Sequence, residues 1–309
     1  MASFTAKDVQ ALREQTGVGM MDCKKALVAS DGDMEKAIDF LREKGLAASQ
    51  KKAGRIAAEG AVLAYNDEAN HIGVLVEVNS ETDFVAKNEV FQAFVLDVAK
   101  TIAANNPADV EELKTMILFG SDRTVQDNLQ DKVLAIGENM NIRRFVRVEG
   151  IVSTYIHMGG TVGVMVEFET DEATAASEAF KTMGKDVAMQ IAAMSPQYLD
   201  PASVPAEVID HEKGILLAQM AEDPAMANKP DKVKEGIISG KIKKFYKENC
   251  LLEQAFVKDD KMSVAQYIAS VAKDLGAAIK CTGFTRFAKG EGLQKKEENF
   301  ADEIARMVQ

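Results

Sequence analysis

Short apolar stripes separated by glycine and serine breaks run through the first fifty residues, a pattern typical of a small helical unit. Three helices are predicted there: one capped by Thr5, one over about Met20–Ala29, and one that Asp33 caps and Gly45 ends. The third helix places an apolar face at i, i+3, i+4 and i+7. That face consists of Met34, Ala37, Ile38 and Leu41. The basic stretch 51–55 then predicts a linker.

The remainder of the chain contains an internal duplication. Residues 59–78 resemble residues 149–168 at an offset of 90, and each copy has the β-branched alternation of a two-stranded hairpin. The helical patterns that follow, 94–104 and 183–193, match at an offset of 89. One residue was therefore lost or gained between hairpin and helix.

Both copies also share an ending, and the second copy contains an insertion. Residues 124–137 resemble 263–276, a helix in each case, and a third strand follows to close each copy. Before that ending, the second copy inserts two helical patterns, about 206–220 and 231–247, separated by prolines. They predict an antiparallel helical hairpin.

These patterns predict an α+β protein whose core is two duplicated subdomains with antiparallel sheets. The expected parts are an N-terminal three-helix domain with linker, two core subdomains, an inserted helical hairpin and a short C-terminal helical module. Their boundaries are 1–55, 56–148, 149–196 with 261–292, 197–260, and 293–309.

Charge and composition narrow the class of partner. The chain has 48 acidic and 37 basic residues, a formal charge of −11, which argues against nucleic acid as the main partner because phosphates are bound by basic side chains. A basic or mixed protein surface fits better. No apolar run approaches a membrane span, and the N-terminus lacks a targeting pattern, so a cytoplasmic protein is expected.

The residues that usually carry chemistry give little support to an enzyme. Cys23, Cys250 and Cys281 are far apart and have no CxxC spacing, and the three histidines lack metal-ligand spacing, so we expect no metal and no cofactor. His157 falls in the hairpin turn of the second copy. A turn shaped by its glycines, with a partly exposed histidine, is the simpler interpretation.

The segment 79–91, NSETDFVAKNEVF, allows two interpretations. In one, Ser80 or Thr82 caps a helix and Phe84 packs inward. In the other, the loop is a binding site held by the duplicated frame, because the matching segment 169–177 of the second copy has no aromatic residue after its acid. The structure of the free protein distinguishes these interpretations, because the second one predicts an exposed Phe84.

Four motifs in the same order resemble the bacterial elongation factor Ts family, along essentially the whole chain. They are TGVGMMDCKKAL at 16–27, TDFVAKN at 82–88, IGENMNIRR at 136–144 and GFTRF at 283–287. The resemblance implies a ubiquitin-associated-like (UBA-like) N-terminal domain, two related core subdomains and a C-terminal helix that packs on the partner.

The same resemblance implies guanine-nucleotide exchange on elongation factor Tu in its GDP-bound and nucleotide-free forms. The motif Thr82, Asp83, Phe84 and Val85 would disturb the partner's magnesium site. The other implied contacts with the partner are Met20, Met21, Lys24, Gly137, Glu138, Asn139 and His157. For the two methionines, packing in the small helical core remains an alternative, which we expect for one of them.

Other functions remain open at this level. A scaffold that binds its partner through the N-terminal domain, without exchange, is the main alternative, and an enzyme acting at His157 is a distant third. A homodimer formed through the helical hairpin is possible, although a complex with elongation factor Tu is the better supported association.

Overall fold

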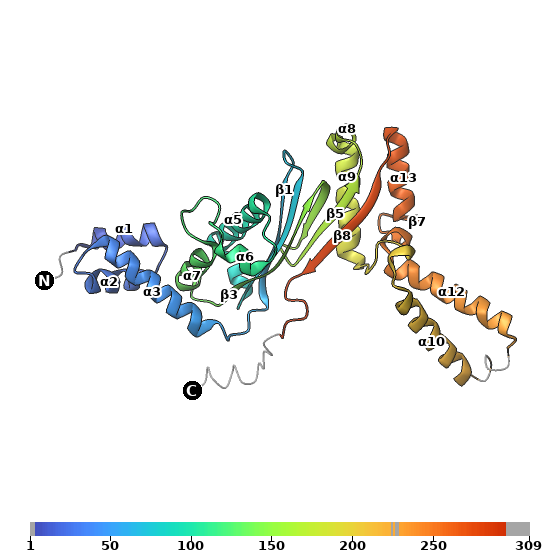
Figure 1. Ribbon diagram of the computed structural model, residues 1–309, viewed down its shortest axis with the longest axis horizontal. Helices are drawn as coiled ribbons and strands as arrows, with labels where there is room; N and C mark the ends of the chain where they lie inside the picture. The colour runs from blue at the N-terminus through green and yellow to red at the C-terminus, as the bar shows by residue number, and fades with distance from the viewer. Residues whose placement is uncertain (1–3, 224, 226–228, 295–309) are drawn as a thin grey trace. The chain divides into compact units, whose positions relative to one another are not determined.

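The computed structural model describes residues 4–223, 225 and 229–294. The chain divides into two compact units by its internal contacts. The first unit is Met1–Val148 with Ile156–Gly163 and Phe287–Gln309, and the second is Glu149–Tyr155 with Val164–Arg286. Helices and strands carry the labels of Figure 1.

The N-terminal part consists of three helices, α1 (Ala6–Thr16), α2 (Met20–Ala29) and α3 (Met34–Lys52). Their small core includes Leu12, Cys23 and Leu27, all fully buried. The Asp33 side chain caps α3 by accepting a hydrogen bond from the Lys36 backbone N–H, as the sequence predicts.

The predicted end of α3 at Gly45 is wrong, because the helix continues to Lys52. Gly45 lies buried where α3 packs on α7 (Val125–Ile136), and a Cβ added to it would lie 3.5 Å from the carbonyl oxygen of Gln130. A small side chain suits this close helix contact. Tertiary packing therefore outweighs the low helix propensity of glycine.

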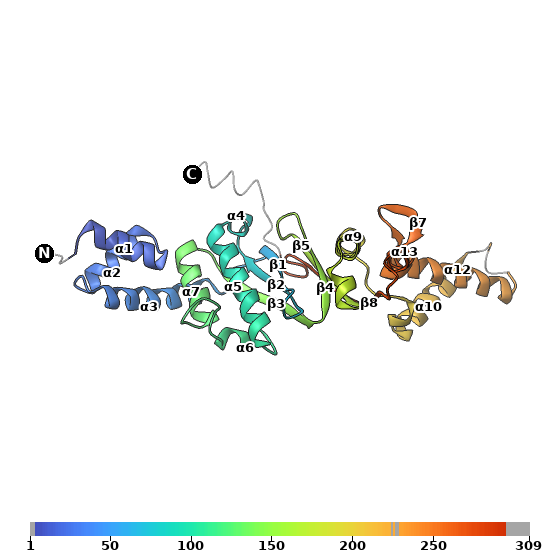
Figure 2. The same cartoon turned by 90° about the horizontal axis from the view of Figure 1, so that it is seen from above.

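The first core sheet has the strand order β1-β2-β3. Its strands are β1 (Glu59–Asp67), β2 (Ile72–Ser80) and β3 (Met140–Glu149). β1 and β2 form an antiparallel hairpin in which Glu59 pairs with Ser80 and Asp67 with Ile72. The helix α5 (Glu89–Asn105) packs on this hairpin and buries Phe91 and Phe94 (Figure 1). The helices α4 (Asp83–Ala86) and α6 (Val110–Thr115) complete this part (Figure 2).

The second copy repeats this plan, which confirms the α+β fold built on a duplication. Its sheet has the order β4-β5-β8, with strands β4 (Ile151–His157), β5 (Val162–Glu169) and β8 (Lys280–Ala288). The corresponding helices are α8 (Glu172–Ala176), α9 (Glu178–Met194) and α13 (Val264–Leu275). The α8–α9 pair therefore corresponds to α4–α5, and α13 corresponds to α7.

The duplicated strand-to-helix junctions locate the one-residue difference between the copies. Thr82 is the N-cap residue of α4, and Asp171 is the N-cap residue of α8. These two residues are 89 positions apart, so the offset has already changed from 90 to 89 where the helices begin. The first copy therefore has one more residue than the second between the end of the strand and the helix, 79–81 against 169–170. With this offset Phe84 corresponds to Ala173, and both are exposed.

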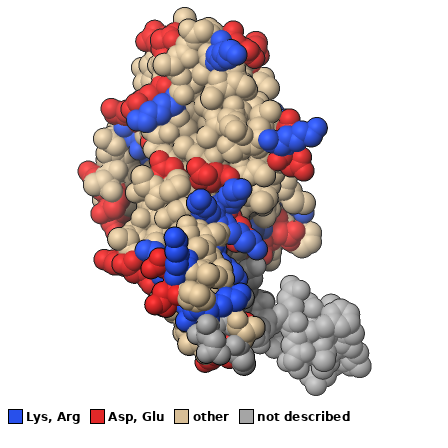
Figure 3. All heavy atoms as spheres, turned by 90° about the vertical axis from the view of Figure 1, so that its right-hand side faces the viewer, with Lys and Arg blue, Asp and Glu red and all other residues tan. Residues whose placement is uncertain are grey.

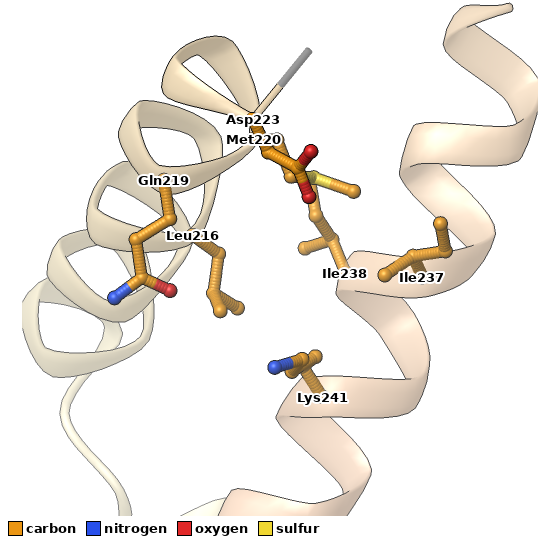
Figure 4. Close-up of a pocket in the computed structure, with 7 residues that line it drawn as sticks. All are labelled: Leu216, Gln219, Met220, Asp223, Ile237, Ile238 and Lys241. Carbon is orange, nitrogen blue, oxygen red and sulfur yellow. The ribbon is translucent and has the colours of Figure 1, made fainter. Parts of the chain in front are cut away.

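The insertion in the second unit is a helical hairpin of α10 (Ala206–Glu222) and α12 (Asp231–Asn249), as the sequence predicts. Leu216, Met220 and Ile238 point into the space between the two helices (Figure 4). Short elements follow in the same unit. They are η1 (Pro201–Ser203), η2 (Leu251–Glu253), β6 (Ala255–Phe256) and β7 (Asp259–Ser263).

Acidic and basic side chains stand next to one another over the face shown in Figure 3. Among the described residues, no helix is both long enough and apolar enough to cross a membrane. The predicted C-terminal helix lies outside the described residues from 295 onward.

Candidate functional site

The junction between β2 and α5 projects an aromatic side chain outward. Phe84 lies in the first turn of α4 and is 79% exposed, which confirms the exposure that the binding-site interpretation predicts. Asp83, beside it, is also exposed. Val85 differs from the expectation, because it is only 5% exposed and belongs to the hydrophobic core. We therefore assign Val85 to anchoring the turn, and the outward surface to Asp83 and Phe84.

Both ends of this turn are fixed by the fold. Val85 and Ala86 pack into the core under α4. Immediately afterwards, Asn88 caps α5, since its side-chain oxygen accepts hydrogen bonds from the backbone N–H groups of Val90 and Phe91. Phe84 cannot turn inward without extracting Val85, because adjacent residues in a helical turn point to different sides.

The charge of Asp83 is partly balanced within the turn. Lys87 Nζ lies 3.2 Å from Asp83 Oδ2, one helical turn away. Both side chains are exposed, so this ion pair contributes little to stability. A partner can replace Lys87 at Asp83 at small energetic cost, which leaves the carboxylate available as a hydrogen-bond acceptor.

A second loop, the one between α7 and β3, holds the start of α4. Glu138 Oε2 accepts a hydrogen bond from the Thr82 backbone N–H at 2.9 Å, and Glu138 Oε1 accepts one from the Thr82 hydroxyl at 2.7 Å. In return, Glu81 Oε1 accepts a hydrogen bond from the Asn139 backbone N–H at 2.6 Å. We call this set of three hydrogen bonds the carboxylate clamp.

The clamp also reaches the end of the N-terminal part. Asn139 Nδ2 donates to the carbonyl oxygen of Arg55 at 2.9 Å, and the Arg55 guanidinium lies 3.3 Å from Glu81 Oε1. Lys52 is close by: burial lowers its pKa, and the Arg55 charge lowers the pKa further, against the opposing effect of Glu81 and Glu138. The chain that leaves α3 is therefore tied to the same two loops.

The base of the site is a fully buried carboxylate on β2. Glu77 contacts Arg143 Nη1 at 3.0 Å and Arg144 Nε at 2.6 Å, and Glu77 Oε1 accepts a hydrogen bond from the Gly290 backbone N–H at 2.7 Å. Burial raises the pKa of Glu77, but the hydrogen bonds from Gly290, Asn79 and Arg144 outweigh it, so the pKa lies below its usual value. The ionised carboxylate joins β2, β3 and the segment after β8.

The N-terminal contact residues lie on the surface of α2. Met20 is 45% exposed and Met21 64% exposed, and Lys24 is exposed as well. The expectation that one of the two methionines belongs to the helical core is wrong. The core positions of this helix are Cys23, Ala26 and Leu27, which leaves both methionines on the outer side.

His157 is exposed at the end of β4, in a turn that continues through Met158, Gly159 and Gly160. These three residues have positive φ angles, so the backbone shape expected of the turn is present. A Cβ on Gly160 would lie 2.9 Å from the Cβ of Ala61. The carbonyl oxygen of Gly160 accepts a hydrogen bond from the Val62 backbone N–H. The turn is therefore held against β1.

One surface hollow in the first unit connects the turn of His157 with the junction of Phe84. It has a volume of about 400 Å³. Its lining includes Ile156 and Gly159 near the turn of His157, and Ala86 and Lys87 at the junction of Phe84. The structure thus brings two of the predicted contact regions together around one apolar depression. A third predicted contact region, the 137–139 loop, is joined to the same junction by the carboxylate clamp.

Sequence reasoning missed the carboxylates that support the site. Glu81 and Glu77 were not candidate residues, although Glu81 directly precedes the motif at Thr82 and Glu77 is a charge within an apolar strand. A charge in a strand with this burial pattern signals a buried partner. For Glu138, the family resemblance implied a contact with the partner, which stays a prediction; the structure shows its carboxylate hydrogen-bonded to Thr82.

The outward surface of the junction presents an aromatic ring and a carboxylate, Phe84 and Asp83. Within the described ranges, no three His, Cys, Asp or Glu side chains are grouped so that they could hold a metal ion. The three cysteines are buried thiols, and burial raises the pKa of Cys250 to about 11 and that of Cys281 to about 12. An exposed aromatic ring beside an acceptor, held by a rigid frame, is suited to insertion into another protein.

Comparisons with known proteins give a consistent result. The family model "Elongation factor TS" matches residues 81–291. The chain is 51% identical to elongation factor Ts of Trichlorobacter lovleyi, with 98% of each chain covered. It is 47% identical to elongation factor Ts of Magnetococcus marinus, with 99% of each covered. With elongation factor Ts of Clostridium perfringens it shares 49% identity over 98% of this chain and 99% of that one.

Proposed function

Since this chain belongs to the elongation factor Ts family and is a translation elongation factor, we propose that it promotes GDP release from elongation factor Tu. The proposed role is non-enzymatic: the protein binds, and no covalent bond changes. It acts on the GDP-bound partner, carries the partner through the nucleotide-free state, and leaves the nucleotide site open for GTP.

The observation that carries this proposal is the exposed Phe84, which stands beside Asp83 on a turn anchored by the buried Val85. GDP in such a partner is held by backbone amides and a magnesium ion. An apolar ring that displaces a loop at that site, together with an acceptor that competes for its donors, weakens both anchors at once. By linkage, a factor that prefers the empty partner must weaken GDP binding by the same ratio.

The test is stopped-flow release of a fluorescent GDP from elongation factor Tu at increasing concentrations of this protein. For Phe84→Ala we expect the maximal release rate to fall by about tenfold or more, because an apolar contact made mainly in the displaced state is lost. The half-saturating concentration should rise less, since other surfaces continue to hold the partner. The double variant Asp83→Ala, Phe84→Ala should lose nearly all acceleration.

A matched control is Phe119→Ala. Phe119 is 51% exposed in the same unit, between α6 and α7, and stacks with Lys100 outside the junction. This variant makes the same chemical change and should release GDP like the wild-type protein. Unchanged release by the Asp83→Ala, Phe84→Ala variant would remove the proposed role of the junction.

The second candidate is a partner-binding scaffold that acts through the N-terminal helices, and the exposed pair Met20 and Met21 favours it. The same titration separates the two candidates. If the methionines only supply affinity, Met20→Ala with Met21→Ala raises the half-saturating concentration and leaves the maximal rate nearly unchanged. If they carry the activity, the maximal rate falls as it does for Phe84→Ala. Self-association through the hairpin stays a prediction.

A further inference from the structure

We propose that Glu138 is a positioning residue for the exchange junction: its carboxylate sets the first turn of α4 so that Phe84 points outward. This inference rests on the proposed function of that junction. It assigns to Glu138 a role within its own chain, in place of the contact with the partner that the family resemblance implied. Glu81 supports the arrangement from the opposite side.

The geometry of the clamp carries the argument. Thr82 occupies the N-cap position of α4, where a hydroxyl usually accepts a hydrogen bond from the first helical turn. Here the hydroxyl instead donates a hydrogen bond to Glu138 Oε1, and the Thr82 backbone N–H donates one to Glu138 Oε2. Both oxygens of one carboxylate are therefore used to fix a single residue, the one directly before Asp83 and Phe84.

A helix as short as α4 depends on such support. It has only four residues, too few for intrahelical hydrogen bonds to stabilise it alone. Val85 and Ala86 anchor its end in the core. Its start is held by hydrogen bonds, one from the buried Ser80 hydroxyl to the Thr82 carbonyl oxygen and two from Thr82 to Glu138. Hydrogen bonds to an ionised group are among the stronger ones in proteins. The clamp therefore supplies the charge-assisted hydrogen bonds at the start of α4, in addition to the neutral one from Ser80.

The second copy provides an internal comparison. Its helix α8 begins at Asp171, whose own side chain accepts hydrogen bonds from the Thr174 backbone N–H at 2.9 Å and from the Thr174 hydroxyl at 2.6 Å. After the duplicated helix, Gly276 corresponds to Gly137, and the next two residues are Ala277 and Ala278. The copy without an aromatic residue at this turn is also the copy without the glutamate that follows the glycine.

A reciprocal arrangement makes the clamp rigid. Glu81 binds the Asn139 backbone N–H while Glu138 binds Thr82, so each loop is held by a side chain of the other. Movement of either loop breaks hydrogen bonds in both directions. We infer that the 137–139 loop transmits its position to Phe84, and that this orientation exists before the partner arrives.

The experiment is the GDP-release titration with full-length Glu138→Ala, Glu138→Gln and Thr82→Val. For Glu138→Ala, which removes two hydrogen bonds of the clamp, we expect the maximal release rate to fall about tenfold. For Thr82→Val, which removes only the hydroxyl hydrogen bond, we expect a fall of about threefold. Glu138→Gln keeps one acceptor oxygen and should lie between Glu138→Ala and the wild type. The half-saturating concentration should change less than twofold in all three, a split that a general loss of folded protein does not produce.

A double-mutant cycle separates positioning from direct contact. If Glu138 acts through the junction, Glu138→Ala has almost no further effect in the Phe84→Ala background, since there is no ring left to position. If Glu138 contacts the partner itself, the two effects multiply, and the proposal is wrong. A matched control is Glu112→Ala: its carboxylate accepts a hydrogen bond from the Ala108 backbone N–H at the start of α6, and its loss should leave exchange unchanged.

The outcomes are distinguishable from those of the proposed function. If the wild-type protein does not accelerate GDP release, the exchange function fails and this inference fails with it. If the wild type accelerates release while Glu138→Ala and Thr82→Val match it, the exchange function stands and only the positioning role is overturned. Thr82→Val is isosteric, so it provides this answer even if Glu138→Ala folds poorly.

Discussion

The two strand-to-helix junctions of the duplicated core begin from the same frame and end differently. In the second copy, Asp171 caps α8 with its own side chain, and the outward position in the first turn holds Ala173. In the first copy, the start of α4 is held by a carboxylate from a distant loop, Glu138, and the outward position holds Phe84. One junction is locally self-sufficient, while the other depends on the tertiary structure.

The difference indicates what is needed to present an exposed aromatic ring on a short turn. A local cap satisfies the backbone but leaves the orientation of the turn to a few bonds within one segment. A clamp between two loops fixes the turn relative to the sheet, at the cost of dependence on both loops. We expect the second arrangement where a side chain has to be held in one direction for binding.

The same contrast appears in the strands below the junctions, and it gives the largest expected effect. Glu77 is fully buried and bound by two arginines, whereas Glu167, its counterpart on β5, is partly exposed. Removing one member of a buried ion network leaves the other charges without compensation. For Glu77→Ala we expect a loss of about 3–5 kcal/mol in the free energy of unfolding of the first unit. For Glu167→Ala in the second unit we expect less than about 1 kcal/mol.

Native-state hydrogen exchange is the suitable measurement, because it reports the amides of β2 and β5 separately. Glu77→Ala should lower protection on β2 far more than Glu167→Ala lowers it on β5. Similar losses at the two positions would show that the two sheets rely on their carboxylates equally. In that case the asymmetry between the copies would be confined to the loops.

A smaller effect follows from the lowered pKa of Glu77. Its folded-state pKa lies below the ordinary value of 4.5, so its contribution is complete above that value and is lost as the pH falls through the folded pKa. We therefore expect the stability difference between wild type and Glu77→Gln to be constant near neutral pH and to shrink below about pH 4.5.

Urea denaturation at a series of pH values from 7 to 3 measures this difference. The charge-removing variant keeps the shape of the side chain, so the comparison isolates ionisation. A difference that grows as the pH falls would mean that the neutral form of Glu77 is the one favoured by the fold.

The contrast between the copies also marks what the sequence could predict. The hairpins, the helices and the outward Phe84 followed from periodicity and from comparing one copy with the other. The clamp did not, because Glu81 and Asn139 are 58 positions apart and nothing local in either segment indicates the other. The continuation of α3 through Gly45 and the exposure of both methionines were missed for the same reason, since helix packing determines each of them.

The smallest expected effect tests whether the aromatic residue or its support makes the site. Ala173→Phe places a ring at the position in the second copy that corresponds to Phe84, on an exposed turn. We expect unchanged stability within about 0.5 kcal/mol and no added GDP release, also when Phe84→Ala is present in the same chain. The turn there is capped locally by Asp171, and Ala277 stands in the second copy where the first copy has Glu138. Recovery of release in the doubly substituted protein would show that any exposed phenylalanine on this frame is sufficient, and the argument for a specially held junction would then fail.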